Sequence, residues 1–78
     1  MGITVKLDYE FKLNGQTFRG IGKDYADTEK ESDIEEMNKN VEELKQGAIC
    51  LALDIDCDEY EERKEEFKNI VFSYVEAR

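Results

Sequence analysis

The feature that most constrains the fold is a strict alternation of apolar and polar residues close to the N-terminus. From residue 3 to residue 13, every second residue is apolar and every residue between is polar. A period of two predicts a β-strand with one face against a core and the other in water. The apolar positions are Ile3, Val5, Leu7, Tyr9, Phe11 and Leu13.

A tight turn follows this strand at Asn14-Gly15. The pair favours a two-residue type I′ hairpin, because both residues tolerate a positive φ. Closing the turn there places Phe11 opposite Phe18 on the core face. On the solvent face it places Glu10 opposite Arg19. An aromatic pair and an ion pair are both favourable across two strands, so the sequence predicts this hairpin and its register together.

The returning strand contains glycines that can interrupt its register. Continuing the pairing sets Gly20 opposite Tyr9 and turns Ile21 toward solvent. A β-bulge near residues 20–22 would return Ile21 and Tyr25 to the core face, unless the strand ends there. The predicted hairpin therefore covers about residues 3–25.

A helix is predicted next, over about residues 28–46. Two overlapping capping boxes, in which Thr or Ser is followed three residues later by Glu, begin at Thr28 and Ser32. Gly47 is the residue type that commonly follows the C-terminus of a helix. The core-facing stripe would be Ile34, Met37, Val41 and Leu44.

The C-terminal third contains a further strand and a segment with two interpretations. Asp58 would cap a helix. Residues 58–77 then fit either one long helix or a short helix to about Lys68 followed by a fourth strand. The strand is an alternative because residues 70–75 are rich in β-branched and aromatic side chains. The whole chain is thus predicted to be one α+β domain, residues 1–78, with helices packed on an antiparallel or mixed sheet. The strand, over about residues 48–56, rests on the alternation of Ile49, Leu51, Leu53 and Ile55.

The two cysteines, Cys50 and Cys57, fall within or next to this strand with opposite parity. They would point to opposite faces and could not form a disulfide with each other. The free thiols and a start without a secretory signal predict that the protein is located in a reducing cytoplasm. If a phage encodes the chain, this is the cytoplasm of the host cell. No run approaches the roughly 20 apolar residues that span a bilayer, so no membrane partner is expected.

Charge is the strongest compositional signal. The chain carries −9, and the excess is uneven, because residues 1–26 carry +1 and residues 27–78 carry −10. A field of this sign repels nucleic acid and anionic membranes and attracts basic protein surfaces or cations. Acidity also keeps a small protein soluble, which is the simpler interpretation of the same charge.

The residues that most catalytic sites need are missing. The chain has no histidine, which is the usual general base near neutral pH. Neither cysteine has the basic neighbours that activate a thiol. Gly15, Gly20 and Gly22 with Lys23 lack the spacing of a phosphate-binding loop. We therefore expect a protein that is not an enzyme and has no cofactor.

A short acidic stretch gives the best candidate metal site. Asp54, Asp56, Asp58 and Glu65 stand at positions 1, 3, 5 and 12 of a loop that resembles the calcium loop of EF-hand proteins. The resemblance breaks at Glu59, where that loop requires glycine for its sharp turn. The stretch therefore favours weak binding of cations over a specific calcium site.

The leading functional hypothesis is an inhibitor that occupies a basic, nucleic-acid-binding site on another protein. An ordered row of carboxylates can imitate the phosphates that such a site receives. In size and charge the chain resembles small acidic inhibitors with which phages block CRISPR nucleases, uracil-DNA glycosylase or restriction enzymes. The candidate partner-binding acids are Glu29, Glu31, Asp33, Glu35, Glu36, Asp54, Asp56, Asp58, Glu59, Glu61, Glu62, Glu65 and Glu66.

Two alternative functions belong to other classes. The first is a structural or assembly protein that forms a homodimer through its sheet edge or its C-terminal segment. Its motivation is that Phe72 and Val75 have no evident place inside one molecule. The second is a divalent-cation-binding protein that uses the acids of residues 54–65.

Overall fold

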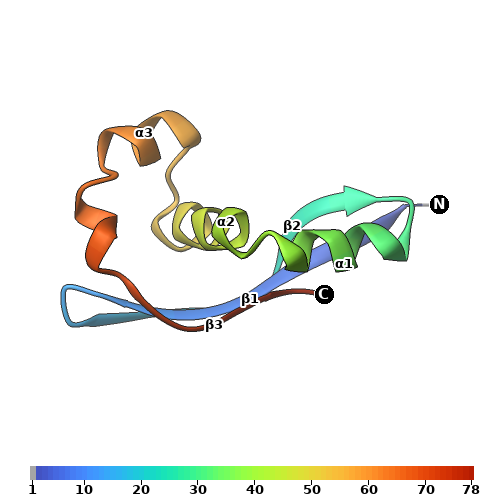
Figure 1. Cartoon of the computed structure of the whole chain (residues 1–78), viewed down its shortest axis with the longest axis horizontal. Coiled ribbons are helices and arrows are strands. Elements are labelled where there is room, and N and C mark those ends of the chain that lie inside the picture. The colour runs from blue at the N-terminus through green and yellow to red at the C-terminus, as the bar shows by residue number, and fades with distance from the viewer. Residues whose placement is uncertain (1) are drawn as a thin grey trace.

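Three antiparallel strands form the sheet, and the long N-terminal strand is its centre. The computed structural model describes residues 2–78, and the strand order is β2-β1-β3. Figure 1 shows the helices on one side of this sheet, which gives a small α+β domain. In chain order the elements are β1 (Ile3–Leu13), β2 (Gln16–Thr28), α1 (Glu31–Lys39), α2 (Val41–Leu53), α3 (Cys57–Glu62), the 3₁₀ helix η1 (Glu66–Asn69) and β3 (Val71–Ala77).

The alternation in β1 builds the core as predicted. Leu7, Tyr9 and Phe11 are fully buried, and they face the helices because they share one side of the strand. The hairpin register is also confirmed, since Phe11 pairs with Phe18 and their ring centroids lie 5.3 Å apart. At the turn, Asn14 has φ 52° and Gly15 has φ 81°, as a type I′ turn requires.

The predicted irregularity in β2 is present, but its effect is only partly as expected. Gly20 pairs with Tyr9, and the register then shifts before Leu7 and again between Lys6 and Val5. Tyr25 packs against the core as predicted, whereas Ile21 remains 75% exposed. Ile21 stays outside because it lies within the first shift, where Ile21 and Gly22 stand across from Asp8 on the solvent face of β1. β2 also continues to Thr28, beyond the predicted end at residue 25.

The region predicted as one helix over 28–46 is helical but divided in two, and the predicted strand over 48–56 is wrong. Two helices, α1 and α2, occupy this region and are separated by Asn40, whose φ and ψ of −102° and 70° are not helical. The Thr28 hydroxyl donates to the Asp33 carboxylate instead of capping α1. The sequence of residues 49–55 is ambiguous, because a short apolar run fits the period of a strand and that of a helix. Of the predicted stripe, Leu44 is buried and Ile34 and Met37 pack against the core, but Val41 is exposed.

Gly47 lies inside α2 and does not end a helix, which corrects its predicted role. A Cβ at this position would overlap the ring of Tyr25, so only glycine lets that ring lie against the helix backbone. A helix-interior glycine costs about 1 kcal/mol relative to alanine, and the packing of Tyr25 explains why it is accepted here. α2 ends instead at Asp54, which adopts a left-handed conformation with φ 55°.

The C-terminal segment follows the second of the two predicted interpretations, a short helix and then a strand. Asp56, and not Asp58, caps α3, because its Oδ1 accepts a hydrogen bond of 2.8 Å from the Glu59 N–H. In β3 the Phe72 ring lies 4.9 Å from that of Phe11, and Val75 pairs with Tyr9. Both therefore have places inside one molecule, which removes the motivation for the homodimer.

Tyr9 carries a buried polar atom that offers a stability test. Its hydroxyl has no hydrogen-bond partner among residues 2–78, although the side chain is fully buried. Such an unsatisfied group costs about 1–3 kcal/mol, so Tyr9→Phe is expected to raise the free energy of unfolding by about 1 kcal/mol. Urea unfolding followed by circular dichroism measures this change. A loss of about 1 kcal/mol or more would mean that the hydroxyl is hydrogen-bonded in solution.

Candidate functional site

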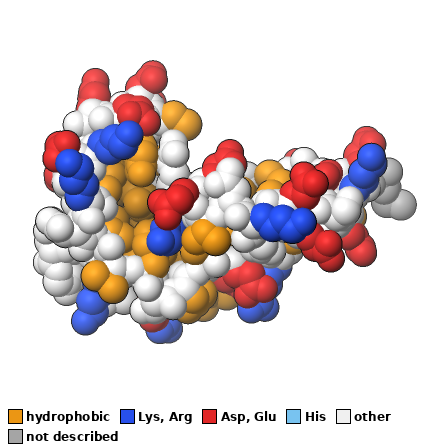
Figure 2. Space-filling model, viewed as in Figure 1, with side chains coloured by type: hydrophobic (Ala, Val, Ile, Leu, Met, Phe, Trp, Pro, Cys, Tyr) orange, Lys and Arg blue, Asp and Glu red, His pale blue; other side chains and the backbone are white. Residues whose placement is uncertain are grey.

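The predicted acids form two separate surfaces rather than one array. All thirteen are exposed except Asp33, which is half-buried. Figure 1 places α1 and α3 toward opposite ends of the long axis, along which the molecule extends 39 Å. Acidic side chains gather at both of these ends in Figure 2. A single patch on a partner that contacts one of these surfaces therefore does not reach the other.

The first group, here called the α3–η1 acidic surface, has half of its eight carboxylates paired with a cation within the chain. Lys64 pairs with Glu61, Lys68 pairs with Glu65 at 2.9 Å, and Arg63 bridges Glu59 at 3.4 Å and Glu66 at 2.9 Å. A carboxylate that already has a cation attracts a second one less strongly. The surface consists of Asp54, Asp56, Asp58, Glu59, Glu61, Glu62, Glu65 and Glu66.

The three aspartates of this surface do not form the predicted row on a strand. Asp54 ends α2, Asp56 caps α3, and Asp58 lies in the first turn of α3. Nor are they gathered around a common point with Glu65. Within residues 2–78, no group of three or more Asp, Glu or Cys side chains is placed to hold a metal ion.

The second group, here called the β2–α1 acidic surface, is free of internal neutralisation. Residues 24–36 contain seven acids and a single base, Lys30. In the part of the chain that the structure describes, none of the seven lies within 4.0 Å of a basic nitrogen. The surface consists of Asp24, Asp27, Glu29, Glu31, Asp33, Glu35 and Glu36.

Asp24 and Asp27 were missed because the sequence placed them at the end of the hairpin and outside the helix. A signal was present, since both lie within two residues of Tyr25, the only aromatic residue between Phe18 and Tyr60. In the structure these two acids line a cavity of about 320 Å³ together with Tyr25. The acidic surface therefore borders an aromatic side chain.

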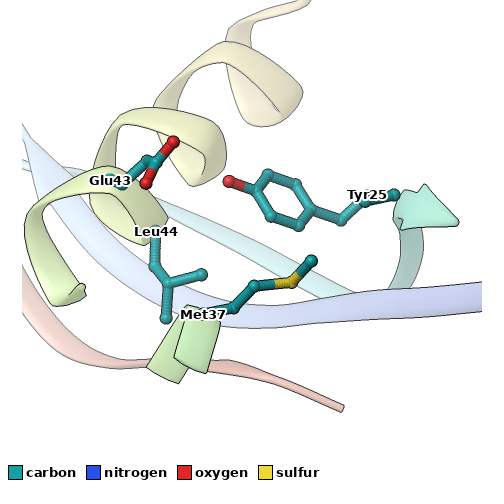
Figure 3. A pocket seen from close by; sticks show the side chains of 5 residues that line it. Tyr25, Met37, Glu43 and Leu44 are labelled. Carbon is teal, nitrogen blue, oxygen red and sulfur yellow. The ribbon is translucent and has the colours of Figure 1, made fainter. Parts of the chain in front are cut away.

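Tyr25 also separates two further cavities between β2 and α2, here called together the Tyr25 groove. They measure about 350 and 330 Å³, and Tyr25 and Glu43 line both. Figure 3 shows the phenol of Tyr25 directed toward the Glu43 carboxylate, with Met37 and Leu44 beneath. The first is completed by Ala26, Met37 and Leu44, and the second by Gln46, Gly47, Cys50, Leu51 and Cys57.

The groove has a carboxylate beside the Tyr25 ring, and its half-buried thiol, Cys50, is not activated as a nucleophile. Burial raises the pKa of Tyr25 above its usual value, and the nearby Glu43 carboxylate adds to the rise. Burial likewise raises the pKa of the Cys50 thiol, with Cys57 and Asp56 acting in the same direction. A nucleophilic thiol needs the opposite shift.

The two cysteines are not on opposite faces of a strand, which corrects the sequence prediction. Cys50 lies on α2 and is half-buried, Cys57 begins α3 and is exposed, and both line the second cavity. Both are free thiols in the structure.

What the site does must be inferred from its own residues. Its two parts are an unpaired acidic surface on β2 and α1 and an adjoining groove with an aromatic ring and a carboxylate. Among residues 2–78, no helix is both long and apolar enough to cross a membrane. No family model, no curated protein and no solved structure matches the chain.

Proposed function

We propose that this protein is a non-enzymatic binding protein that occupies a basic surface of a partner protein with its β2–α1 acidic surface. The observation that supports this most directly is the density of unpaired charge, seven acids and one lysine in residues 24–36. Unpaired carboxylates steer and hold a basic partner without first breaking an internal ion pair. The α3–η1 acidic surface is secondary, because lysine and arginine side chains already pair with four of its eight carboxylates.

The most specific form of the proposal is inhibition of a protein that handles nucleic acid. A cleft that binds nucleic acid is lined with lysine and arginine, and it receives phosphates spaced along a backbone. Exposed carboxylates on a rigid strand and helix present charge of the same sign. Phage inhibitors of host defence nucleases are a class with this size and charge. The absence of histidine agrees with a role that needs no proton transfer.

The test compares two variants with the same change in net charge. In the first, Glu29, Glu31, Glu35 and Glu36 become Gln; in the second, Glu59, Glu61, Glu65 and Glu66 become Gln. Each protein is immobilised, and heparin-binding proteins from a bacterial lysate are passed over it. We expect the first variant to lose about tenfold or more in retention of the captured protein, and the second to change little, because exposed unpaired charges each contribute up to about 1 kcal/mol.

Two further measurements make this result decisive. Retention should fall steeply between low and high salt, because exposed charges are screened. A duplex oligonucleotide should displace the captured protein if its nucleic-acid site is the one occupied. Equal losses in both variants would show that only net charge matters, and retention that is independent of salt would contradict the proposal.

A further inference from the structure

The Tyr25 groove combines an apolar wall, an aromatic ring and one carboxylate in a single cavity. Met37 and Leu44 form the wall, and Glu43 lies at the hydroxyl end of the Tyr25 ring (Figure 3). Glu43 accepts a hydrogen bond of 2.9 Å from the Asn40 side chain, and it forms no ion pair with any of residues 2–78. The cavity therefore contains a negative charge without a positive partner.

Elsewhere in this chain the same combination is completed by a cation. The Lys45 ammonium lies 5.7 Å from the centre of the Phe72 ring and 3.6 Å from a carboxylate oxygen of Glu42. The ring face and the carboxylate both attract this cation. Arg63 repeats this arrangement 5.3 Å from the Phe67 ring, paired with Glu59 and Glu66.

The groove also has the size and rigidity of a preformed site. Its larger cavity, about 350 Å³, lies at the lower end of the range for ligand sites, which suits one side chain rather than a cofactor. Leu44 is buried, and the missing side chain at Gly47 lets the Tyr25 ring lie directly on α2. The ring and the wall therefore need little rearrangement to receive an occupant.

The lining of this cavity favours a basic side chain over the alternatives. An acidic side chain would be repelled by Glu43, Asp24 and Asp27, and an apolar one would gain nothing from the Glu43 carboxylate, which is exposed and accepts a hydrogen bond from Asn40. A long basic side chain places its methylene stem on the apolar wall and its charged end at the carboxylate. The Tyr25 hydroxyl oxygen, which is directed toward Glu43, can accept a hydrogen bond from the same cation.

We propose that the Tyr25 groove receives one lysine or arginine side chain of the basic partner, with its stem against Met37 and Leu44 and its cation at Glu43. The inference rests on the proposed function, because it assumes that the partner is basic. It adds an anchor to that function: the acidic surface attracts the partner, and the groove fixes the position of one residue.

The test uses two peptide probes with the same charge and different stems. Tetralysine carries four-carbon stems, whereas the tetramer of 2,4-diaminobutyric acid carries its amines on two carbons, and both are used at about pH 6, where the side-chain amines of both are protonated. Each is titrated into the protein at low salt and followed by NMR of the backbone amides and of the Met37 and Leu44 methyl groups. We expect both probes to shift amides of the β2–α1 acidic surface, and tetralysine alone to shift the methyl groups.

Two single variants identify the carboxylate. Glu43→Gln is expected to weaken tetralysine at least fivefold and to abolish the methyl shifts. The neighbouring Glu42→Gln, which removes the same charge from a residue paired with Lys45, should leave the methyl shifts intact. Unchanged binding by Glu43→Gln would overturn the assignment of Glu43.

The outcomes separate the two proposals. If both probes bind equally and neither shifts the methyl groups, the groove is not an anchor and the acidic surface remains the binding element. Equal methyl shifts with both probes would also overturn the inference, because the stem would then play no part. If neither probe shifts any amide of the β2–α1 acidic surface at low salt, the proposed function fails and the inference fails with it.

Discussion

Replacing Phe11 with alanine is expected to lower the free energy of unfolding by about 3–5 kcal/mol, the range for deleting a buried aromatic side chain. Phe11 lies at the centre of the sheet and is fully buried. Its ring is 5.8 Å from that of Tyr9, 5.3 Å from Phe18 and 4.9 Å from Phe72, so it joins all three strands. A domain of this size has a total stability of only about 4–12 kcal/mol, and the variant should therefore be close to unfolding.

Urea unfolding followed by circular dichroism measures this loss, and Ile21→Ala is its matched control. Ile21 lies on β2 and is 75% exposed, so its truncation should change stability by about 0.5 kcal/mol or less. A loss below about 1.5 kcal/mol for Phe11→Ala would show that the aromatic cluster does not form the core. Equal losses for the two variants would mean that Phe11 is no more buried than Ile21, which would contradict the assignment of the core face of β1.

Gly20→Ala is the second substitution with a large expected effect, a loss of about 2–3 kcal/mol from overpacking. A Cβ at residue 20 would overlap the ring of Tyr9, its partner across the two strands. The ring is fully buried and cannot swing into solvent. The added methyl group must therefore displace either the ring or the backbone of β2.

A control and a rescue make this prediction specific. Gly2→Ala should be nearly neutral, because the nearest atom to its Cβ, the Thr28 carbonyl oxygen at 3.8 Å, is at an ordinary contact distance. In a double-mutant cycle, Tyr9→Leu should relieve part of the overlap. The double variant should therefore lose less stability than the sum of the losses in the two single variants. Strict additivity would show that the ring of Tyr9 does not lie over Gly20.

The hairpin was predictable because its determinants are local. The alternation in β1 sets which side chains face the core, and Asn14-Gly15 sets the register of β2. Glu10 and Arg19 then meet on the solvent face, with 2.9 Å between the Arg19 Nε and a Glu10 carboxylate oxygen. The Arg19 guanidinium lowers the pKa of Glu10. None of this required knowledge of the rest of the chain.

The middle of the chain was decided by packing. The apolar residues between 48 and 55 fit a period of two, and they also fit a helix whose buried positions are Leu44, Ala48 and Ile49. The core face of β1 needs a covering layer, and α2 supplies it. The strand that completes the sheet is instead β3, whose residues are 59 to 70 positions from their partners in β1 along the chain.

The candidate site divides in the same way. The sequence by itself determined the sign of the charge, its concentration after residue 26 and the absence of histidine. Only the tertiary structure decided which acids remain unpaired and that Tyr25 meets Glu43 across the groove. The physical reason is that composition and hydrophobic period depend only on which residues are present and on their order along the chain. Ion pairs, cavities and close approaches such as Tyr25 on Gly47 depend on distances that exist only after folding.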